Sequence, residues 1–494
     1  MSRLLLISLG LFIPILANAN DGKTDAIPDM ISFTKDVRPI FQQHCQGCHQ
    51  PAKAQGGYVL TDYSGLLKTG ETGKAPVVAG KPAESFLIEE IRTRDGKHEM
   101  PKNRDALTTR QFAIVEKWIK QGAKDDTPPV AKSAIVSKEN PPQYSAPPVV
   151  TSLAFSPDGK RLAVSGYHEI LLFSADGTKL LNRFIGISER IQSIAFSPDG
   201  KRLAAAGGSP GRFGEVQIWD VEKEDLIVST PVTADTLYGV SWSPDGSTVA
   251  FGCSDNTVRA IDATTGKQTL QMGTHSDLIL GTVFSRDGKH LASVSRDMSM
   301  KLTEVATQRF IDNVTSITPG ALKGGLMAIA IRPVTSKWLQ VLPADTPGVP
   351  RKWYDELLFA GADGVPRLYK MHREKKREIG DDSNKVKDYP AMPGRVSAVA
   401  FDSTGRKFAA VSSLDGKGEV RIYDAASAKT TTCEGVNRPA YTVAWKPGNT
   451  VLASAGFDGI VWLHDASTGK LISKFQAVPK TVAATASNSS NNQR

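Results

Sequence analysis

The stretch Phe155-Ser156-Pro157-Asp158-Gly159 decides the fold of most of this chain, because it returns at regular intervals. Close copies begin at residues 196 and 242, and altered copies begin at residues 284, 401 and 445. Neighbouring copies are therefore 41, 46, 42 and 44 residues apart, with one longer gap of 117 residues between 284 and 401. Repeats of about 40–45 residues that each form a four-stranded sheet are typical of β-propellers. The long gap leaves room for one divergent repeat, so we predict seven blades.

Each repeat has the chemistry of a tight turn between two strands. Proline presets the turn, aspartate supports it, and glycine takes the left-handed position. In the divergent repeat, residues 328–333 are predicted to form the first strand and residues 356–369 the next two. Third strands are predicted to end on an aspartate, at Asp220, Asp262, Asp424 and Asp465.

These features resemble WD40 repeats over residues 149–477. The resemblance implies an all-β propeller that takes part in protein–protein interaction. The fullest copy contains His275, Ser293 and Asp297, but Thr303 stands where the family has tryptophan. We therefore expect His275 and Asp297 to have a structural role. The histidines at 168, 290, 372 and 464 fall in unrelated blades, so we expect no metal site among them.

A second motif, Cys45-Gln46-Gly47-Cys48-His49, precedes the repeats. Two cysteines three positions apart, followed directly by histidine, are the attachment signature of c-type haem. The two thiols bind the vinyl groups of one porphyrin, and the adjacent imidazole becomes the proximal iron ligand. We therefore predict one covalently bound haem c, attached at Cys45 and Cys48 with His49 on the iron.

Two other interpretations of this motif are a thioredoxin-like redox pair and half of a zinc site. A redox pair requires a βαβ context, which the surrounding sequence lacks. A zinc site requires a second pair of ligands, and the two other cysteines, Cys253 and Cys433, stand alone. These two are predicted to lie in the third and sixth blades, too far apart for a disulfide.

The second axial ligand must come from the same small domain. Met100 lies in a loop before Pro101, and its thioether sulfur is a soft ligand that suits haem iron. The rival ligand is His98, which would give a bis-histidine haem. His44 is too close to the motif to reach the opposite face. We predict His49 and Met100 as the axial pair.

Helical patterns surround the motif over residues 33–126. Thr34 is predicted to cap a helix that continues into the motif, and residues 84–92 are predicted to form another helix. Thr108 is predicted to cap a last helix that Gly122 terminates. A small all-α domain is therefore expected, in which the haem supplies much of the core.

The segment resembles the planctomycete-type cytochrome c domain over roughly residues 32–125. The matching stretches, in the family's order, are Phe33-Thr34-Lys35-Asp36-Val37-Arg38-Pro39-Ile40-Phe41, the haem motif, Val78-Ala79-Gly80-Lys81-Pro82, Met100-Pro101 and Trp118-Ile119-Lys120-Gln121-Gly122-Ala123. Lys102 stands where the family usually has a second proline. The resemblance implies a monohaem domain at the front of an exported multidomain protein.

The remaining segments set the domain boundaries. Residues 1–19 combine a basic start, a short apolar run and a small-residue cleavage site, which predicts a secretory signal peptide. The cytochrome domain is assigned to 20–126, a proline-rich linker to 127–148, the propeller to 149–477 and a disordered tail to 478–494. We expect no transmembrane segment in the mature chain and a periplasmic location.

The charge distribution gives no indication of nucleic-acid binding, and we expect no nucleic-acid partner. The formal charge of +9 is spread over a long chain, and residues 20–126 hold 16 Lys and Arg against 15 Asp and Glu. A basic cluster at residues 370–377 is predicted to be a solvated loop rather than a docking patch.

Two classes of function remain. The first is an electron-transfer cytochrome whose propeller docks a redox partner protein or acts as a scaffold. The alternative is a periplasmic redox enzyme whose propeller binds a substrate and passes electrons to the haem. The sequence contains no glycine-rich phosphate loop, second haem motif or metal cluster, which favours the carrier and predicts no catalytic residues.

Overall fold

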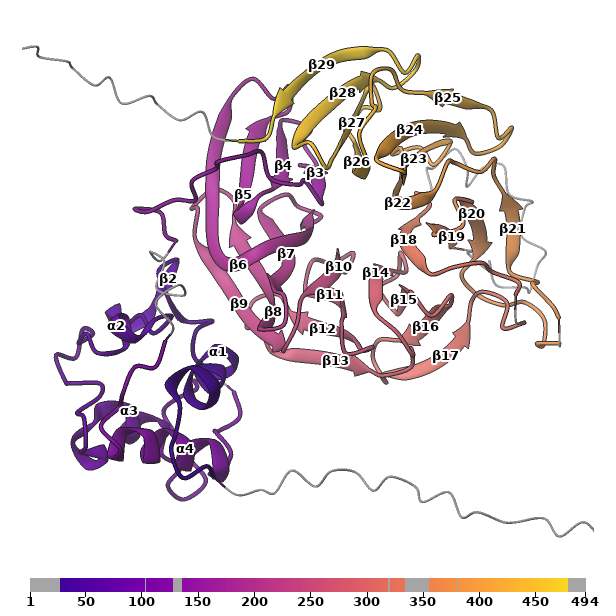
Figure 1. The fold of residues 1–494 in the computed structure, drawn as a ribbon. Helices are drawn as coiled ribbons and strands as arrows, with labels where there is room; N and C mark the ends of the chain where they lie inside the picture. Colours follow the sequence, from indigo (N-terminus) through magenta and orange to yellow (C-terminus); the bar gives the residue numbers. More distant parts are fainter. Residues whose placement is uncertain are drawn as a thin grey trace, which may run out of the picture.

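The protein is described by a computed structural model that covers residues 27–102, 104–127, 136–318, 320–333, 355–378 and 380–478. A small helical unit lies beside a ring of β-sheets (Figure 1). The predicted signal peptide (1–19), part of the predicted linker and nearly all of the predicted tail fall outside the described residues. The small all-α domain and the all-β propeller confirm the predicted fold class.

The helical unit consists of short elements. They are η1 (Phe33–Val37), α1 (Arg38–His44), η2 (Gln55–Gly57), α2 (Tyr63–Leu66), η3 (Pro82–Glu84), α3 (Phe86–Ile91) and α4 (Thr109–Lys120), with a ribbon of β1 (His49–Gln50) and β2 (Lys53–Ala54). The Phe33 ring stacks on Trp118, with ring centroids 5.4 Å apart. Val37, Val115 and Ile119 are fully buried beside them, so η1 and α4 form the centre of this core.

One predicted helix cap is confirmed and one is wrong. Thr108 accepts a hydrogen bond from Gln111 N, and the Gln111 side chain bonds back to Thr108 N, which is a capping box. Thr34 does not cap the first helix. Ser32 accepts the bond from Lys35 N, while the Thr34 hydroxyl donates to Asp126 at 2.9 Å. The helix begins two residues earlier than its sequence pattern indicates.

Among the described residues, the ring contains one seven-stranded sheet and five four-stranded sheets, each in consecutive order. The first sheet comprises β3 (Leu153–Phe155), β4 (Arg161–Ser165), β5 (Tyr167–Ser174), β6 (Leu180–Phe196), β7 (Arg202–Ser209), β8 (Phe213–Asp220) and β9 (Leu226–Thr233). The next two are β10 (Leu237–Trp242), β11 (Thr248–Cys253), β12 (Val258–Asp262) and β13 (Gln268–Met272), then β14 (Ile279–Phe284), β15 (His290–Ser295), β16 (Met300–Glu304) and β17 (Arg309–Asn313). The fourth sheet comprises β18 (Leu326–Ile331), β19 (Glu356–Gly361), β20 (Arg367–Lys370) and β21 (Lys385–Asp388). The fifth comprises β22 (Arg395–Phe401), β23 (Lys407–Leu414), β24 (Lys417–Asp424) and β25 (Thr430–Thr432). The sixth comprises β26 (Ala440–Trp445), β27 (Val451–Gly456), β28 (Ile460–Asp465) and β29 (Leu471–Gln476).

The seven-stranded sheet holds two blades, because the long strand β6 belongs to both. Its first part pairs with β5, where Phe184 lies opposite Ile170, and its last part pairs with β7, where Ile194 lies opposite Ala205. The described strands therefore form seven blades, as the repeat spacing predicts. We number them from blade 1 (β3–β6) to blade 7 (β26–β29).

Blades 7 and 1 lie next to each other where the ring closes (Figure 1). Their apolar side chains pack into one cluster. Leu153 N donates to Thr442 Oγ1 at 3.0 Å, and Val150 N donates to Gly456 O at 2.9 Å. The rings of Phe173 and Phe475 lie 4.9 Å apart across the same junction. These contacts join the two blades, because each blade supplies its own four strands and neither takes a strand from the other.

Local turn chemistry sets the strand ends. In the first repeat, Ser156 Oγ donates to Asp158 Oδ1 at 2.5 Å, and Gly159 has φ +69°. At the other end of a blade, Asp262 Oδ1 accepts from Thr264 N at 3.0 Å and from Thr265 N at 2.7 Å. Both turns depend on residues within five positions, which is why the repeat pattern locates the strands so well.

Blade 5 is the divergent repeat, and its strands β18, β19 and β20 lie where the sequence predicts them. Residues 334–354 lie outside the description. Ion pairs fix the basic cluster at residues 370–377. Arg373 Nη1 lies 2.6 Å from Asp381 Oδ1, and both Arg373 and Arg377 lie within 3.0 Å of Asp312. The cluster is therefore largely neutralised.

Candidate haem site

The haem motif forms a compact turn at the end of α1. Cys45 N donates to Phe41 O at 2.9 Å, which continues the helix by one residue. Cys48 N and His49 N both donate to Cys45 O at 3.1 Å. Two thiols and one imidazole therefore leave the backbone within a single turn, as attachment to one porphyrin requires.

The His49 ring is fixed through one of its two nitrogens. Nδ1 lies 3.2 Å from Tyr58 O, and the Tyr58 ring contacts the imidazole at a centroid distance of 5.6 Å. Since a carbonyl oxygen can only accept a hydrogen bond, Nδ1 carries the hydrogen and Nε2 keeps its lone pair for a metal. Burial lowers the pKa of His49, which favours the neutral form that a ligand must have.

The two candidate distal ligands differ in what already contacts them. Met100 is half-buried and packs against the same apolar core as Cys45, and its backbone N donates to Glu90 O at 2.9 Å. His98 Nε2 lies 3.0 Å from Arg104 O, so that nitrogen is engaged by the backbone. His44 Nε2 lies 3.1 Å from the Gln111 amide. The sulfur of Met100 is thus the candidate without a competing polar contact.

The donor set fits haem c better than either alternative. A catalytic cysteine of a redox pair has a lowered pKa, whereas burial raises the pKa of Cys45 to about 12. Within the described residues, no group of three or more His, Cys, Asp or Glu side chains could hold a metal ion. A zinc site at the motif therefore lacks ligands, while two free thiols, an imidazole and a thioether suit a covalently attached haem.

Comparison with known proteins matches the two parts of the chain to different families. The family described as Planctomycete cytochrome C matches residues 45–104. The family described as WD domain, G-beta repeat matches residues 142–178, 178–220 and 266–303, and an anaphase-promoting complex subunit 4 WD40 domain matches 232–283. The chain is a planctomycete-type cytochrome c domain fused to WD40 repeats. These matches support a haem-binding protein that carries a protein-interaction module.

One curated relative matches part of the cytochrome–WD40 chain. The U3 small nucleolar RNA-associated protein 21 homolog of Schizosaccharomyces pombe is 26% identical over 103 residues. The match covers 21% of this chain and 11% of that protein. The chain thus spans about a tenth of the length of this relative.

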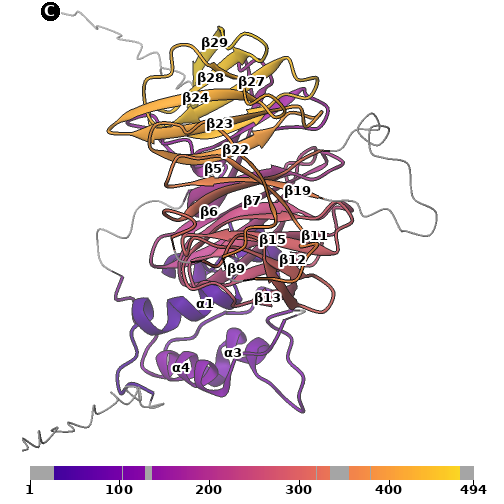
Figure 2. The same cartoon turned by 90° about the vertical axis from the view of Figure 1, so that its right-hand side faces the viewer.

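The haem motif lies against the propeller, a contact that sequence patterns did not reveal. The cytochrome c domain sits beside blade 2, with α1 next to β9 (Figures 1 and 2). Gln50 Nε2 donates to Ser229 Oγ at 2.9 Å, and Arg104 Nη2 donates to Thr230 Oγ1 at 3.0 Å. Lys53 Nζ donates to Ile227 O. The outer edge of blade 2 is therefore covered by the turn that carries the haem ligands.

Other histidines and cysteines of the propeller have structural surroundings. His275 Nδ1 lies 2.9 Å from Asp297 Oδ2, and His275 Nε2 lies 2.8 Å from Ser293 Oγ. Cys253 and Cys433 are free and buried in blades 3 and 6. One expectation needs correction. His290 and His372 belong to adjacent blades, 4 and 5, and their rings contact at a centroid distance of 4.6 Å.

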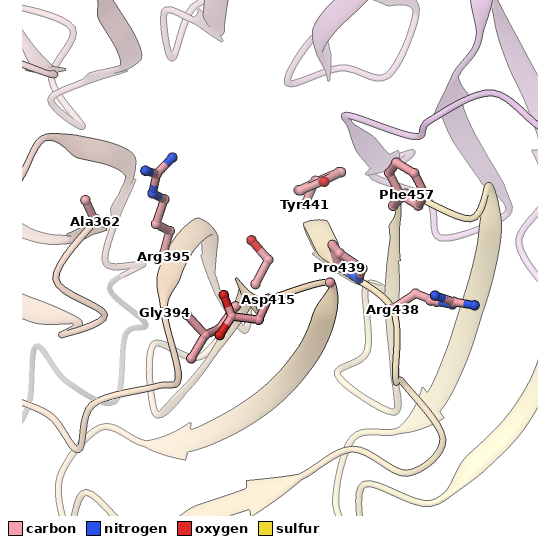
Figure 3. Close-up of a pocket in the computed structure, with 11 residues that line it drawn as sticks. Ala362, Gly394, Arg395, Asp415, Arg438, Pro439, Tyr441 and Phe457 are labelled. Atoms are coloured by element: carbon pink, nitrogen blue, oxygen red, sulfur yellow. The ribbon is translucent and has the colours of Figure 1, made fainter.

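An open hollow of about 620 Å³ lies on the propeller where blades 5, 6 and 7 meet (Figure 3). Its walls combine two cations, Arg395 and Arg438, with Tyr441, Phe457 and Asp415. Phe457 is 56% exposed, which is unusual for so large an apolar ring. The hollow therefore has the mixed cationic and aromatic lining of a recognition site.

Proposed function

We propose that the protein is an exported monohaem c-type cytochrome that acts in electron transfer, with its WD40 propeller as a docking or scaffold module. The observation that carries the proposal is the turn after α1, in which Cys45, Cys48 and His49 are presented together and Tyr58 O holds the His49 tautomer. The redox partner is proposed to be a protein, because WD40 repeats mediate protein–protein interaction.

The residues have separate tasks at this site. Cys45 and Cys48 would hold the haem through thioether bonds, and His49 Nε2 and Met100 Sδ would bind its iron. The bound haem supplies reversible one-electron chemistry. With both residues bound to the iron, the chain would bind no substrate there. Its own work is to fix the ligands, exclude water from them and position the haem against blade 2.

Export is proposed from the predicted signal peptide at residues 1–19 and from the type of cytochrome domain. None of the helices in the described residues is long and apolar enough to cross a membrane. A periplasmic location would place the chain where covalent haem attachment takes place.

The proposal is tested by following haem through denaturation. The wild-type protein, expressed with the haem-attachment machinery, is expected to keep one haem per chain on a denaturing gel, as haem staining and intact mass show. Cys45→Ala with Cys48→Ala is expected to lose the haem entirely. Cys253→Ala with Cys433→Ala, a matched control in blades 3 and 6, is expected to keep it. A wild-type protein without bound haem contradicts the proposal.

The second candidate is a redox enzyme. The hollow where blades 5, 6 and 7 meet favours this function. In this case a small anionic substrate contacts Arg395 and Arg438 and delivers electrons to the haem. A screen of small-molecule donors distinguishes the two functions. Repeated turnover that Arg395→Ala with Arg438→Ala abolishes supports the enzyme, whereas reduction by protein donors alone supports the carrier.

A further inference from the structure

A completely buried carboxyl group lies just behind the haem motif. Glu215 is on β8 in blade 2, and its exposed fraction is 0%. None of the described cationic side chains forms an ion pair with it. An isolated buried carboxylate is costly, so a group of this kind tends to exchange a proton rather than keep a fixed charge.

Hydrogen-bond donors surround Glu215. Ser188 Oγ donates to Oε2 at 2.5 Å, Gln217 Nε2 donates to Oε2 at 2.8 Å, and Ser229 Oγ donates to Oε1. Trp219 Nε1 donates to Gln217 Oε1 at 3.1 Å, which turns the Gln217 amide so that its nitrogen faces the carboxyl. Burial raises the pKa of Glu215, while these hydrogen bonds act in the opposite direction. The ionised and neutral forms are therefore both accommodated.

Gln50 links this carboxyl to the haem turn. Gln50 directly follows His49, and its Nε2 donates to Ser229 Oγ at 2.9 Å and to Gln46 O at 3.2 Å. Gln50 is therefore connected to Glu215 through the Ser229 hydroxyl. Its other polar atom, Oε1, is buried without a partner. Rotation of the amide would present Oε1 to the carboxyl, where it could accept the proton of a neutral Glu215.

We infer that Glu215 is a redox-linked proton acceptor for the haem held at Cys45, Cys48 and His49. When one electron from the partner protein reduces the haem iron from ferric to ferrous, the Glu215 carboxylate takes one proton from water and forms an O–H bond. When the electron leaves, the proton returns to water. The inference rests on the proposed electron-transfer function and adds a residue of the propeller to it.

The physical basis is the charge balance at the domain interface. Oxidation adds one positive charge to the haem, and an anionic Glu215 in the same low-dielectric region stabilises that charge. Reduction removes the charge and leaves an unbalanced buried carboxylate, which protonation relieves. The coupling needs the contact between Gln50 and Ser229, because without it water would screen the two charges.

Other ionisable groups on the surrounding elements are occupied elsewhere. Burial and hydrogen bonds are the leading influences on the pKa of Glu215, and none of these is a charge. In the haem domain, Cys45 would be in its thioether bond and His49 on the iron, and Lys53 and Arg104 donate to β9. In the propeller, Arg183 pairs with Glu169, and Glu189 pairs with Arg212. Arg202 donates to Gly246 O. The other ionisable groups on the packed strands are Arg190 on β6, Asp220 at the end of β8, and Tyr238 on β10.

Potentiometric titration of the full-length holoprotein between pH 5 and 9 tests the inference. The midpoint potential of the wild type is expected to fall as pH rises, approaching about 59 mV for each tenfold change in proton activity. Glu215→Gln, which keeps the shape and removes the titration, is expected to flatten the profile. Glu189→Gln, on the neighbouring strand β6, is the matched control and should keep the wild-type slope.

Redox-induced infrared difference spectra provide a second readout. Reduction of the wild type is expected to produce a carboxylic-acid C=O band that Glu215→Gln lacks. Equal slopes in the wild type and Glu215→Gln, or a band that persists in the variant, overturn the inference. If Glu215→Gln does not fold, Ser188→Ala removes one donor to the carboxylate, keeps the contact between Gln50 and Ser229, and should move the sloping region to higher pH; an unmoved profile also overturns it. Failure of the proposed function would give a different result in the same titration, because the wild type would then show no reversible one-electron couple.

Discussion

Gly47 of the haem motif lies directly against Ser229 of the propeller. A β-carbon on Gly47 would be 2.1 Å from Ser229 O, a distance that real β-carbons essentially never show, and 3.1 Å from Ser229 C, which is tight. The middle of the attachment turn is thus shaped to fit the edge of β9. Because Gly47 does not have a left-handed φ, this close approach is what excludes a side chain there.

Gly47→Ala should therefore separate the cytochrome c domain from blade 2. The added methyl group collides with backbone, which cannot move aside as a flexible side chain could. Hydrogen exchange of the peptide spanning β9 measures the effect, and we expect its protection to fall. Gly273→Ala is the matched control, because the nearest atom to its new β-carbon is 3.9 Å away. Equal protection in the two variants would show that the contact does not hold the domains together.

The Gly47–Ser229 contact also shows where sequence reasoning ends. The turns at Asp158 and Asp262 depend on neighbours along the chain, so the repeat pattern located their strands. Gly47 and Ser229 are far apart in sequence, and no periodicity relates the outer strand of one blade to a haem motif. The cytochrome c domain, its motif and the seven blades could be predicted, but the place where the two parts meet could not.

Two further residues show the same limit for side chains. Glu215 lies in the strand sequence Gly214-Glu215-Val216, which reads as a half-exposed strand, yet its side chain is fully buried under the haem turn. The contact between His290 and His372 was missed because the blade that holds His372 is the divergent one. In each case the contacting residue lies in a different domain or blade, so neither composition nor repeat spacing indicates the contact.

Removal of Arg183 should destabilise blade 1 strongly. Arg183 Nε and Nη2 lie 2.6 and 2.9 Å from the two oxygens of Glu169, whose side chain is 0% exposed. Arg183→Ala leaves that carboxylate buried, and Tyr144 OH, at 2.6 Å, is then its remaining side-chain donor among the described residues. We expect a loss of about 3–5 kcal/mol, measured by chemical denaturation. Arg212→Ala breaks an exposed pair with Glu189 and should cost about 0–1 kcal/mol. Similar losses would contradict the buried pair's role.

Because of Asp297, the stability of blade 4 should fall at acid pH. Although burial acts to raise it, hydrogen bonds from His275, Ser299 and Ser276 N hold the pKa of Asp297 well below its usual value. Since the unfolded carboxyl titrates near pH 4, this stabilisation is complete above about pH 4 and is lost as pH falls further, through the lower pKa of the folded state. Asp297→Asn is expected to cost about 1–3 kcal/mol at pH 7. The difference from the wild type should shrink below pH 4 in thermal unfolding curves; a constant difference would rule out the linkage.

The distal ligand decides whether the iron is closed to small molecules. If Met100 is the ligand, the iron is low-spin, and the oxidised protein shows the weak red absorption band of iron–thioether ligation. Met100→Ala should abolish the band, lower the reduction potential and let cyanide bind, because thioether ligation raises the potential relative to a second nitrogen. Met100→His should stay low-spin at a lower potential.

His98→Ala is the control for this assignment. His98 Nε2 already contacts Arg104 O at 3.0 Å, so its removal should leave the spectrum and the potential unchanged. The opposite pattern, in which Met100→Ala keeps the wild-type spectrum and His98→Ala changes the spin state, would assign the iron to His98. A high-spin wild-type protein that binds cyanide readily would contradict both ligands. The redox enzyme would then be the better account of the chain, because an open iron can bind a substrate directly.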